Sequence, residues 1–211
     1  MIDVWYTNFT LKPSREIWDL YFQRIPTGLR DKICRFHRWQ DQTAGLLGKI
    51  LLLEGLSEYG YPSDCLNGLS YTEYGRPFLS GAIDFNISHS GEYVVCAISD
   101  TAKVGVDIER RRSIELKDFD NYMTPAQWEA IYASSRPFEK FFEFWTIKES
   151  VLKVDGRGLS LSLLDIQVDG DKALTQENIW HINRIDLHSD YSCHLATDMK
   201  NAPIELKPFV Y

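Results

Sequence analysis

The chain has 211 residues, of which 44% are hydrophobic and 25% are charged, so it is long and apolar enough to bury a full core. Its formal net charge of −7 argues against general nucleic-acid binding, which depends on neutralising phosphates. The four cysteines form no CxxC pair and have no zinc-ligand spacing with histidines. Cys96 and Cys193 stand in apolar strand-like runs as expected buried thiols, which favours a reducing compartment. The N-terminal residues lack signal-peptide features, and no apolar run approaches the roughly 20 residues that cross a bilayer. We therefore expect a cytoplasmic protein that contacts neither nucleic acid nor membrane.

The first half of the chain predicts a strand, then helices, then further strands. Alternation at 2–9 is typical of a strand, and Ser14 can cap a helix that runs to about residue 24. A turn at Pro26 leads into a helical stretch from about 29 to 59, which Gly60 can end. Strand signals follow near 69–74, 83–88 and 92–99.

The second half predicts the same order of elements. A strand at 103–109 is followed by a helix that begins at Thr124-Pro125, where proline occupies the first helical position. A longer helix covers about 138–154 and stops before Gly156. Strands are expected near 164–169, 179–187 and 191–198.

The repeated order of strand, long helix and antiparallel strands predicts an α+β fold. We expect two similar halves, residues 1–103 and 104–211, each a long helix against a small antiparallel sheet. A faint internal similarity supports this division, since Leu47-Gly48-Lys49 aligns with Thr146-Ile147-Lys148 when the sequence is shifted upon itself. The boundary falls beside the strand at 103–109, and junctions between domains are common places for binding sites.

Acidic residues of two predicted elements form the strongest candidate site. On the strand at 103–109, Asp107 and Glu109 share one face, because successive side chains of a strand point to opposite faces. On the helix at 138–154, Glu149 and Lys153 lie one turn apart on one face. Three carboxylates and an ammonium suit a hard divalent cation and a phosphate, since magnesium takes few carboxylates and completes its octahedron with phosphate oxygens and water.

Each part of this candidate site also has a plainer interpretation. Asp107 and Glu109 taken alone are compatible with a solvated strand face. Glu149 and Lys153 taken alone form an i,i+4 ion pair, which stabilises an exposed helix by about 0.3–0.5 kcal/mol. Only their occurrence together favours a binding site.

Seven ordered motifs extend these observations over most of the chain. They are Leu46-Leu47-Gly48, Tyr74-Gly75-Arg76-Pro77, Phe85-Asn86-Ile87-Ser88-His89-Ser90-Gly91, Val104-Gly105-Val106-Asp107-Ile108-Glu109, Trp145-Thr146-Ile147-Lys148-Glu149-Ser150, Lys153, and Gly156-Arg157-Gly158-Leu159-Ser160. In this order and spacing they resemble the 4′-phosphopantetheinyl transferase family, and the chain length is similar to that of its larger, surfactin-synthetase-activating type. The resemblance implies the 4′-phosphopantetheinyl transferase fold, in a monomer whose halves are related by a pseudo-two-fold axis.

The resemblance also implies a reaction. Coenzyme A gives its phosphopantetheine arm to a serine hydroxyl of an acyl or peptidyl carrier protein, and adenosine 3′,5′-bisphosphate leaves. The hydroxyl must approach a pyrophosphate whose anionic oxygens repel it, and a Mg²⁺ ion, or Mn²⁺ in its place, lowers this repulsion.

The same resemblance assigns roles to the acidic residues and their lysine. Asp107, Glu109 and Glu149 match the metal-binding carboxylates of the family. Glu149 is also the candidate general base for the serine hydroxyl. Lys153 matches a lysine that contacts the phosphates, where it stabilises charge in the transition state.

Residues of the first half are expected to hold the nucleotide end of coenzyme A. His89 matches a histidine that contacts its phosphates, and the neighbouring Ser88 can donate a hydrogen bond. Arg76 matches a basic residue near the nucleotide, and Lys32 matches one of the basic residues around the 3′-phosphate.

The chain also departs from the family pattern. Leu29 replaces a common lysine, and Ala44-Gly45 replaces a pair of arginine–threonine type, so how the 3′-phosphate is held stays open. Gln127 stands where some members carry a glutamate near the metal, and a neutral amide cannot act as a charged ligand.

Other functions remain open at this point. A pocket with fewer basic residues than usual is also compatible with a protein that binds coenzyme A or a carrier protein without turnover. A metal-dependent phosphohydrolase would need similar residues. A serine hydrolase is disfavoured, because the segment around His89 lacks a GxSxG elbow. Arg110-Arg111-Arg112 is either a solvated charge run or a site that attracts an acidic carrier protein or a phosphate.

Overall fold

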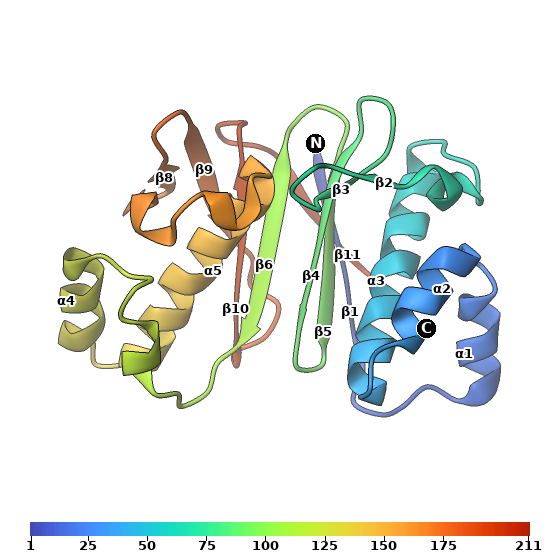
Figure 1. Cartoon of the computed structure of the whole chain (residues 1–211), viewed down its shortest axis with the longest axis horizontal. Coiled ribbons are helices and arrows are strands. Elements are labelled where there is room, and N and C mark those ends of the chain that lie inside the picture. Colours follow the sequence, from blue (N-terminus) through green and yellow to red (C-terminus); the bar gives the residue numbers. More distant parts are fainter.

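The computed structural model describes residues 1–211, except that the side chain of Leu159, part of the last sequence motif, lies outside the described residues. Two sheets stand in the middle of the molecule, and helices cover its two outer sides (Figure 1). The helices are α1 (Arg15–Phe22), α2 (Thr27–Cys34), α3 (Trp39–Glu58), α4 (Pro125–Ala133) and α5 (Pro137–Asp155). The strands are β1 (Ile2–Asn8), β2 (Ser70–Tyr71), β3 (Pro77–Phe78), β4 (Asp84–Ser90), β5 (Tyr93–Ser99), β6 (Val104–Arg110), β7 (Gln167–Asp169), β8 (Lys172–Leu174), β9 (Ile179–Arg184), β10 (Tyr191–Thr197) and β11 (Ile204–Pro208).

The strand order divides the chain into two sheets and a short ribbon. The first sheet has the order β11-β1-β5-β4, the second has the order β6-β10-β9-β8-β7, and β2 pairs with β3. α3 packs on the first sheet, and α5 packs on β6 and β10 of the second. The predicted α+β class, with a long helix against each sheet, is confirmed. Within the part of the chain that the structure describes, no helix combines the length and apolarity needed to cross a bilayer.

The molecule has four layers in the order helices, sheet, sheet, helices, and apolar clusters hold them together. Leu51 of α3 is fully buried against the first sheet. Val95 of β5 and Val106 of β6 are buried in a cluster that lies between the two sheets. Val151 of α5 and Trp180 of β9 are buried between the last helix and the second sheet. Each aliphatic side chain buried in this way contributes about 1.5–3 kcal/mol. The cluster between the sheets therefore holds together the two lobes of the molecule, the first sheet with α1–α3 and the second sheet with α4 and α5.

The helical stretch expected at 29–59 is two helices rather than one. α2 ends at Cys34 and folds back onto α3, so that Ile33 and Phe36 lie against Gly45 of α3. Leu29 and Ile33 are thereby buried in the same core as α3. One straight helix would carry these two side chains away from the sheet, and the loss of their burial explains why the prediction was wrong.

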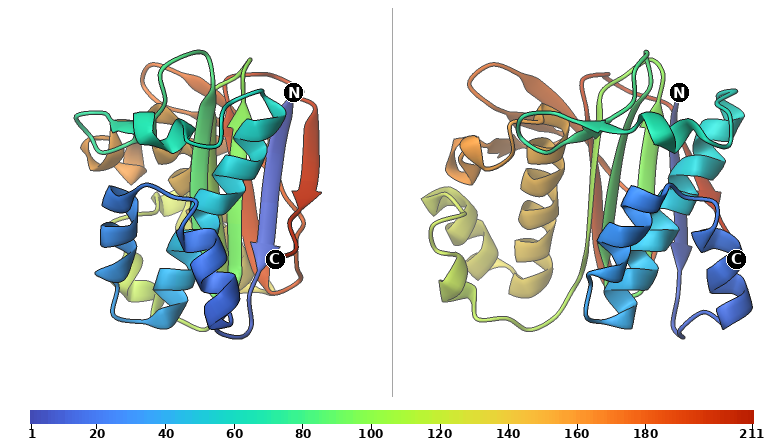
Figure 2. Two further views of the ribbon diagram at one scale, coloured as in Figure 1. Left: turned by 90° about the vertical axis from the view of Figure 1, so that its right-hand side faces the viewer. Right: turned by 45° about the vertical axis from the view of Figure 1, so that its right-hand side comes forward.

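The sequence also did not reveal β8 or β11. β11 returns to the first lobe and pairs in parallel with β1, with Ile2 opposite Ile204 (Figure 2). Phe209 then donates its backbone N–H to the carbonyl of Tyr6 at 2.8 Å. The first sheet is therefore not purely antiparallel, and the division at residue 103 stays a prediction.

A seam of hydrogen bonds joins the two sheets where β4 and β6 run side by side. Alternate side chains of β4 accept hydrogen bonds from backbone N–H groups of β6. The pairs are Asp84 with Val104 (2.8 Å), Asn86 with Val106 (3.0 Å), Ser88 with Ile108 (3.3 Å) and Ser90 with Arg110 (3.1 Å). The seam fixes the register between the lobes and brings Ser88 and Ser90 beside the acidic residues of β6.

Candidate active site

The acidic residues of β6 face α5, because a glycine lets the strand approach the helix closely. A Cβ atom on Gly105 would lie 2.5 Å from the backbone nitrogen of Val154 and would also overlap the carbonyl oxygen of Ser150. On the opposite face of β6, Val106 and Ile108 enter the core between the sheets. The alternation predicted from the sequence is thus present, and it directs Asp107 and Glu109 toward the helix that carries Glu149.

Asp107 and Lys153 form an ion pair at the centre of this region. The Lys153 ammonium lies 2.6 Å from Oδ1 of Asp107 and donates to the Ser88 hydroxyl at 2.9 Å and to the Val106 carbonyl at 3.2 Å. Ser88 in turn donates to Oδ1 of Asp107 at 2.9 Å. Oδ2 of Asp107 is buried and has no hydrogen-bond partner among the described residues. A buried carboxylate oxygen without a partner is costly, and a bound cation would satisfy it.

The three carboxylates influence one another. Burial raises the pKa of Glu149, and the charges of Asp107 and Glu109 raise it further against the opposing effect of Lys153. Burial likewise raises the pKa of Glu109, whose Oε2 accepts a hydrogen bond from Ser90 at 2.7 Å. Like charges held close together disfavour ionisation, and a divalent cation would remove that penalty.

These residues fit a hard divalent cation by their chemistry. Carboxylate oxygens are the protein ligands that Mg²⁺ uses, and one oxygen of Asp107 lacks a partner. Among the described residues, however, no three His, Cys, Asp or Glu side chains already surround a common point at metal-binding distance. The described side chains therefore form no preassembled metal site, and substrate oxygens and water would complete the coordination of a cation held there.

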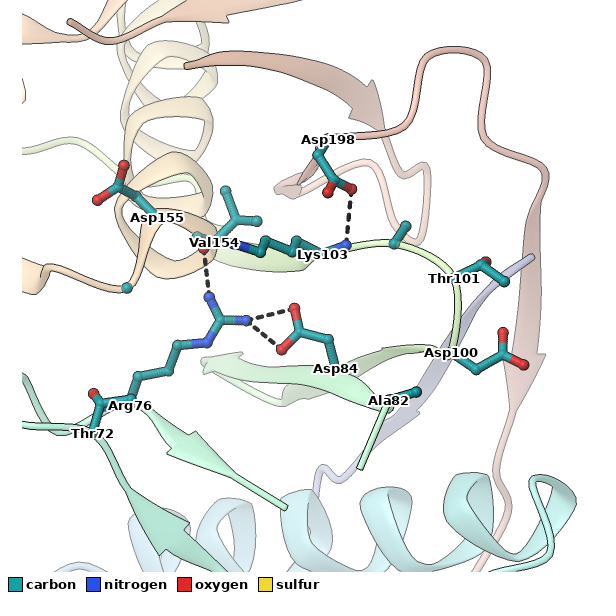
Figure 3. A pocket seen from close by; sticks show the side chains of 12 residues that line it. Thr72, Arg76, Ala82, Asp84, Asp100, Thr101, Lys103, Val154, Asp155 and Asp198 are labelled. Carbon is teal, nitrogen blue, oxygen red and sulfur yellow. Dashed lines mark hydrogen bonds and ion pairs between the residues drawn. The ribbon is translucent and has the colours of Figure 1, made fainter. Parts of the chain in front are cut away.

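Arg76 clamps the C-terminal end of α5 to both central strands. Its guanidinium donates to both carboxylate oxygens of Asp84 at 2.8 Å, to the Val104 carbonyl at 3.0 Å and to the Val154 carbonyl at 2.6 Å (Figure 3). A further hydrogen bond joins it to the carbonyl of Lys153 itself. The structure shows Arg76 holding the helix that presents Lys153, and the nucleotide contact expected from the sequence stays a prediction.

The cavity drawn in Figure 3 has a volume of about 500 Å³ and lies beside this clamp. Three of its four carboxylates have partners within the protein, and the fourth, Asp100, is exposed. Asp84 pairs with Arg76, Asp155 pairs with Arg157, and Asp198 accepts from the backbone N–H of Lys103. Three of the four carboxylates are therefore committed to contacts within the protein.

Two other cavities lie next to each other, one between the lobes and one within the first lobe. One, of about 310 Å³, contains Glu149 and Lys153. The other, of about 340 Å³, contains Lys32 and His89. Pro77 and Asn86 line both cavities, so a single elongated ligand can pass from one to the other.

The structure brings the expected binding residues of the first lobe together at the second of these cavities. His89 is exposed at the rim, and partial burial together with the charge of Lys153 lowers its pKa. The ammonium of Lys32 lies 4.1 Å from the centre of the Tyr71 ring, an arrangement that leaves it exposed. Ser88 lies in the ion-pair centre, and Arg76, whose guanidinium forms the clamp, lines the cavity of Glu149 and Lys153.

Sequence reasoning missed three polar residues of the site. Ser90 binds Glu109, Asn86 lines both cavities, and Lys49 reaches the cavity of Lys32 and His89. Ser90 and Asn86 were detectable, because they share the face of Ser88 on an alternating strand. Lys49 gave no comparable signal, since it stands in an apolar helical segment.

Two further polar residues turn out to be structural. The Oε1 atom of Gln127 accepts from the backbone N–H of Thr124 at 3.0 Å, while Thr124 caps the same helix, so both serve the start of α4. His194 of β10 stands opposite Asp107 and shares a 2.7 Å hydrogen bond with the hydroxyl of Thr146. Burial lowers the pKa of His194 to about 4, so its ring is neutral at pH 7.

Comparisons with known proteins show the family to which the chain belongs. The chain matches the family model of the 4′-phosphopantetheinyl transferase superfamily over residues 103–205 and that of the 4′-phosphopantetheinyl transferase N-terminal region over residues 10–101. It is 31% identical over 187 residues to 4′-phosphopantetheinyl transferase gsp of Aneurinibacillus migulanus, covering 87% of this chain and 77% of that protein. It is also 31% identical over 188 residues to 4′-phosphopantetheinyl transferase Sfp of Bacillus subtilis (strain 168), covering 87% and 81%. A crystal structure of holo-[acyl-carrier-protein] synthase from Thermotoga maritima superposes with a TM-score of 0.37 at 16% identity, over 45% of this chain and 61% of that one.

Proposed function

Because the chain belongs to the 4′-phosphopantetheinyl transferase superfamily and is an enzyme of that class, we propose that it moves the 4′-phosphopantetheine arm of coenzyme A onto a serine of an acyl or peptidyl carrier protein. Adenosine 3′,5′-bisphosphate is the other product, and the reaction depends on Mg²⁺. We further expect a monomer. The observation that carries the proposal is that the charges of Asp107 and Glu109 raise the pKa of Glu149, while Lys153 pairs with Asp107 and lines one cavity together with Glu149.

Asp107, Glu109 and Glu149 are the residues that would hold the cation. When bound, Mg²⁺ supplies charge neutralisation at the pyrophosphate and at the leaving oxygen. The unpartnered Oδ2 atom of Asp107 supports this assignment, as do the raised pKa values of Glu109 and Glu149. Ser88 and Ser90 hold the Asp107 and Glu109 carboxylates in place by hydrogen bonds.

In the transfer reaction, Glu149 accepts a proton and Lys153 stabilises negative charge. The pKa of Glu149 is raised toward the working pH, which suits a group that accepts the proton of the carrier serine. Lys153 stabilises anionic oxygen at the pyrophosphate, and the seam residue Ser88 and the Val106 carbonyl orient its ammonium. The Arg76 clamp fixes the helix end from which Lys153 projects.

The nucleotide end of coenzyme A belongs in the cavity of Lys32 and His89. This cavity is of a size that suits part of a nucleotide, and it opens at Asn86 toward the cavity of Glu149 and Lys153. The pyrophosphate would then pass over Lys153, with its reactive phosphorus near Glu149.

Mass measurement of a carrier domain tests the proposal. The protein is incubated with Mg²⁺, coenzyme A and several apo carrier domains, and a gain of one phosphopantetheine arm is expected on at least one of them. Asp107→Asn and Glu149→Gln should abolish the gain while melting like the wild type, with Glu73→Gln, at an exposed loop position, as the matched control.

Two outcomes would contradict the transfer reaction. Tight coenzyme A binding without modification of any carrier would favour a non-catalytic binding protein, which the Asp107–Lys153 ion pair also permits. Release of phosphopantetheine without a carrier would favour a phosphohydrolase.

A further inference from the structure

The cavity of Lys32 and His89 contains a second lysine whose charge is not compensated. Lys49 projects from α3 into this cavity, and the cavity lining includes no acidic residue. Within the described residues, the Lys49 ammonium has neither an ion pair nor a hydrogen bond to the protein, whereas Lys153 has Asp107 and Arg76 has Asp84. An uncompensated, partly buried ammonium is unfavourable in the free protein and becomes favourable when an anion binds.

Among the described residues, the surroundings of Lys49 contain no compensating anion. Burial lowers the pKa of Lys49, and the charge of Lys32 lowers it further. A charged Cys96 would raise the pKa of Lys49. Burial, however, raises the pKa of the Cys96 thiol far above its ordinary range, so this thiol is neutral. No protein anion therefore stands in for the missing partner in the described part of the cavity.

The sequence around Lys49 lets its ammonium reach the cavity. Helical side chains lean toward the N-terminus, so the aliphatic part of Lys49 lies over the turn that contains Gly45. A Cβ atom on Gly45 would already touch Ile33 and Phe36 at 3.4 Å, which shows how little room this turn has for a larger side chain. Gly45 thus keeps this turn free of a side chain that would crowd Ile33 and Phe36, which line the same cavity as Lys49.

We propose that Lys49 binds the 3′-phosphate of coenzyme A and gives the enzyme its preference for coenzyme A over dephospho-coenzyme A. This inference rests on the proposed function, because it takes the pyrophosphate to lie near Lys153. A ligand that spans the two adjoining cavities then has its ribose end beside Lys49, His89 and Lys32. Coenzyme A carries a phosphomonoester on that ribose and dephospho-coenzyme A lacks it. Lys32 is exposed, so water and salt screen its charge, whereas Lys49 is the inner cation.

Calorimetric titration of the whole protein with coenzyme A, dephospho-coenzyme A and adenosine 3′,5′-bisphosphate tests the inference without turnover. Lys49→Gln should weaken binding of the two ligands that carry the 3′-phosphate by about 10- to 100-fold, the range for one charge-assisted hydrogen bond. Binding of dephospho-coenzyme A should stay the same. Lys49→Arg should keep the preference, and Lys200→Gln, at an exposed turn, is the matched control. Equal loss for all three ligands, or no loss for any, would overturn the role of Lys49.

Melting temperatures provide a second readout. Lys49→Met should melt at or above the wild-type temperature without ligand, because it removes an uncompensated charge, and should gain less from added adenosine 3′,5′-bisphosphate. A much lower melting temperature would overturn the inference by showing that Lys49 holds the fold. If no carrier domain is modified by the wild type while the ligand preference depends on Lys49, the transfer reaction fails and the role of Lys49 stands.

Discussion

Replacing Gly105 by alanine should separate β6 from α5 and thereby disable the site. The added methyl group would lie 2.5 Å from the nitrogen of Val154 and 2.9 Å from its Cβ atom, and it would overlap the Ser150 carbonyl oxygen. Two of these atoms belong to the backbone of a packed helix, so they cannot rotate away. Strand and helix must therefore move apart by about 1 Å, and overpacking of this kind costs about 1–3 kcal/mol.

We expect the upper end of that range for Gly105→Ala, about 3 kcal/mol of unfolding free energy. For a domain of this size this corresponds to a fall in melting temperature of about 6–12 °C. Activity should fall more steeply than stability, because a displacement of about 1 Å in an active site can cost about 100-fold in rate. The same displacement would lengthen the Asp107–Lys153 ion pair, which is now 2.6 Å.

Thermal unfolding and the carrier-modification rate, measured at a temperature where the variant is folded, check both effects. Gly28→Ala is the matched control, because a Cβ atom on this α2 glycine would have nothing within 4 Å. The control should be as stable as the wild type or up to about 1 kcal/mol more stable, since alanine is the better helix former. A Gly105→Ala protein with wild-type melting temperature and rate would refute the argument that close strand–helix contact builds the site.

Two further predictions concern the residues around the site. Acidification from pH 7 to pH 5 should cost about 2 kcal/mol of stability through His194, because its imidazole takes up a proton near pH 6.5 when unfolded but only near pH 4 when folded. Urea unfolding at both pH values should show this loss in the wild type and not in His194→Gln, and equal losses in both proteins would speak against it. Arg76→Lys keeps the charge but cannot reproduce the hydrogen bonds of the guanidinium to both oxygens of Asp84. It should lower the unfolding free energy by about 2 kcal/mol and reduce the transfer rate more than the affinity for coenzyme A. If this variant melts normally and only its affinity for coenzyme A falls, Arg76 is a ligand contact after all.

The sequence revealed those parts of the fold and site that depend on local periodicity. Asp107 and Glu109 share a face because strands alternate, and Glu149 and Lys153 share one because helices repeat every three to four residues. The capped helix starts at Ser14 and Thr124 were likewise readable, because a capping side chain bonds to a backbone group only three residues away.

Features that depend on distant partners were not readable. The clamp around Arg76 needs a carboxylate, carbonyls of β6 and carbonyls of α5, which meet only after both lobes have packed. The break between α2 and α3 was hidden because helical periodicity continues on both sides of it. The sequence did not single out Lys49, because its distinguishing property is the lack of a nearby counter-ion, and residue spacing carries no information about that.

The parallel pairing of β1 with β11 has a consequence for how this protein is made. β1 is synthesised early, yet its neighbours are β5, about 90 residues later, and β11, about 200 residues later. Until residue 208 has left the ribosome, one edge of β1 keeps its backbone groups open to other chains. The nascent chain therefore passes through a long interval in which its N-terminal lobe can aggregate, and the lobe closes only when β11 emerges.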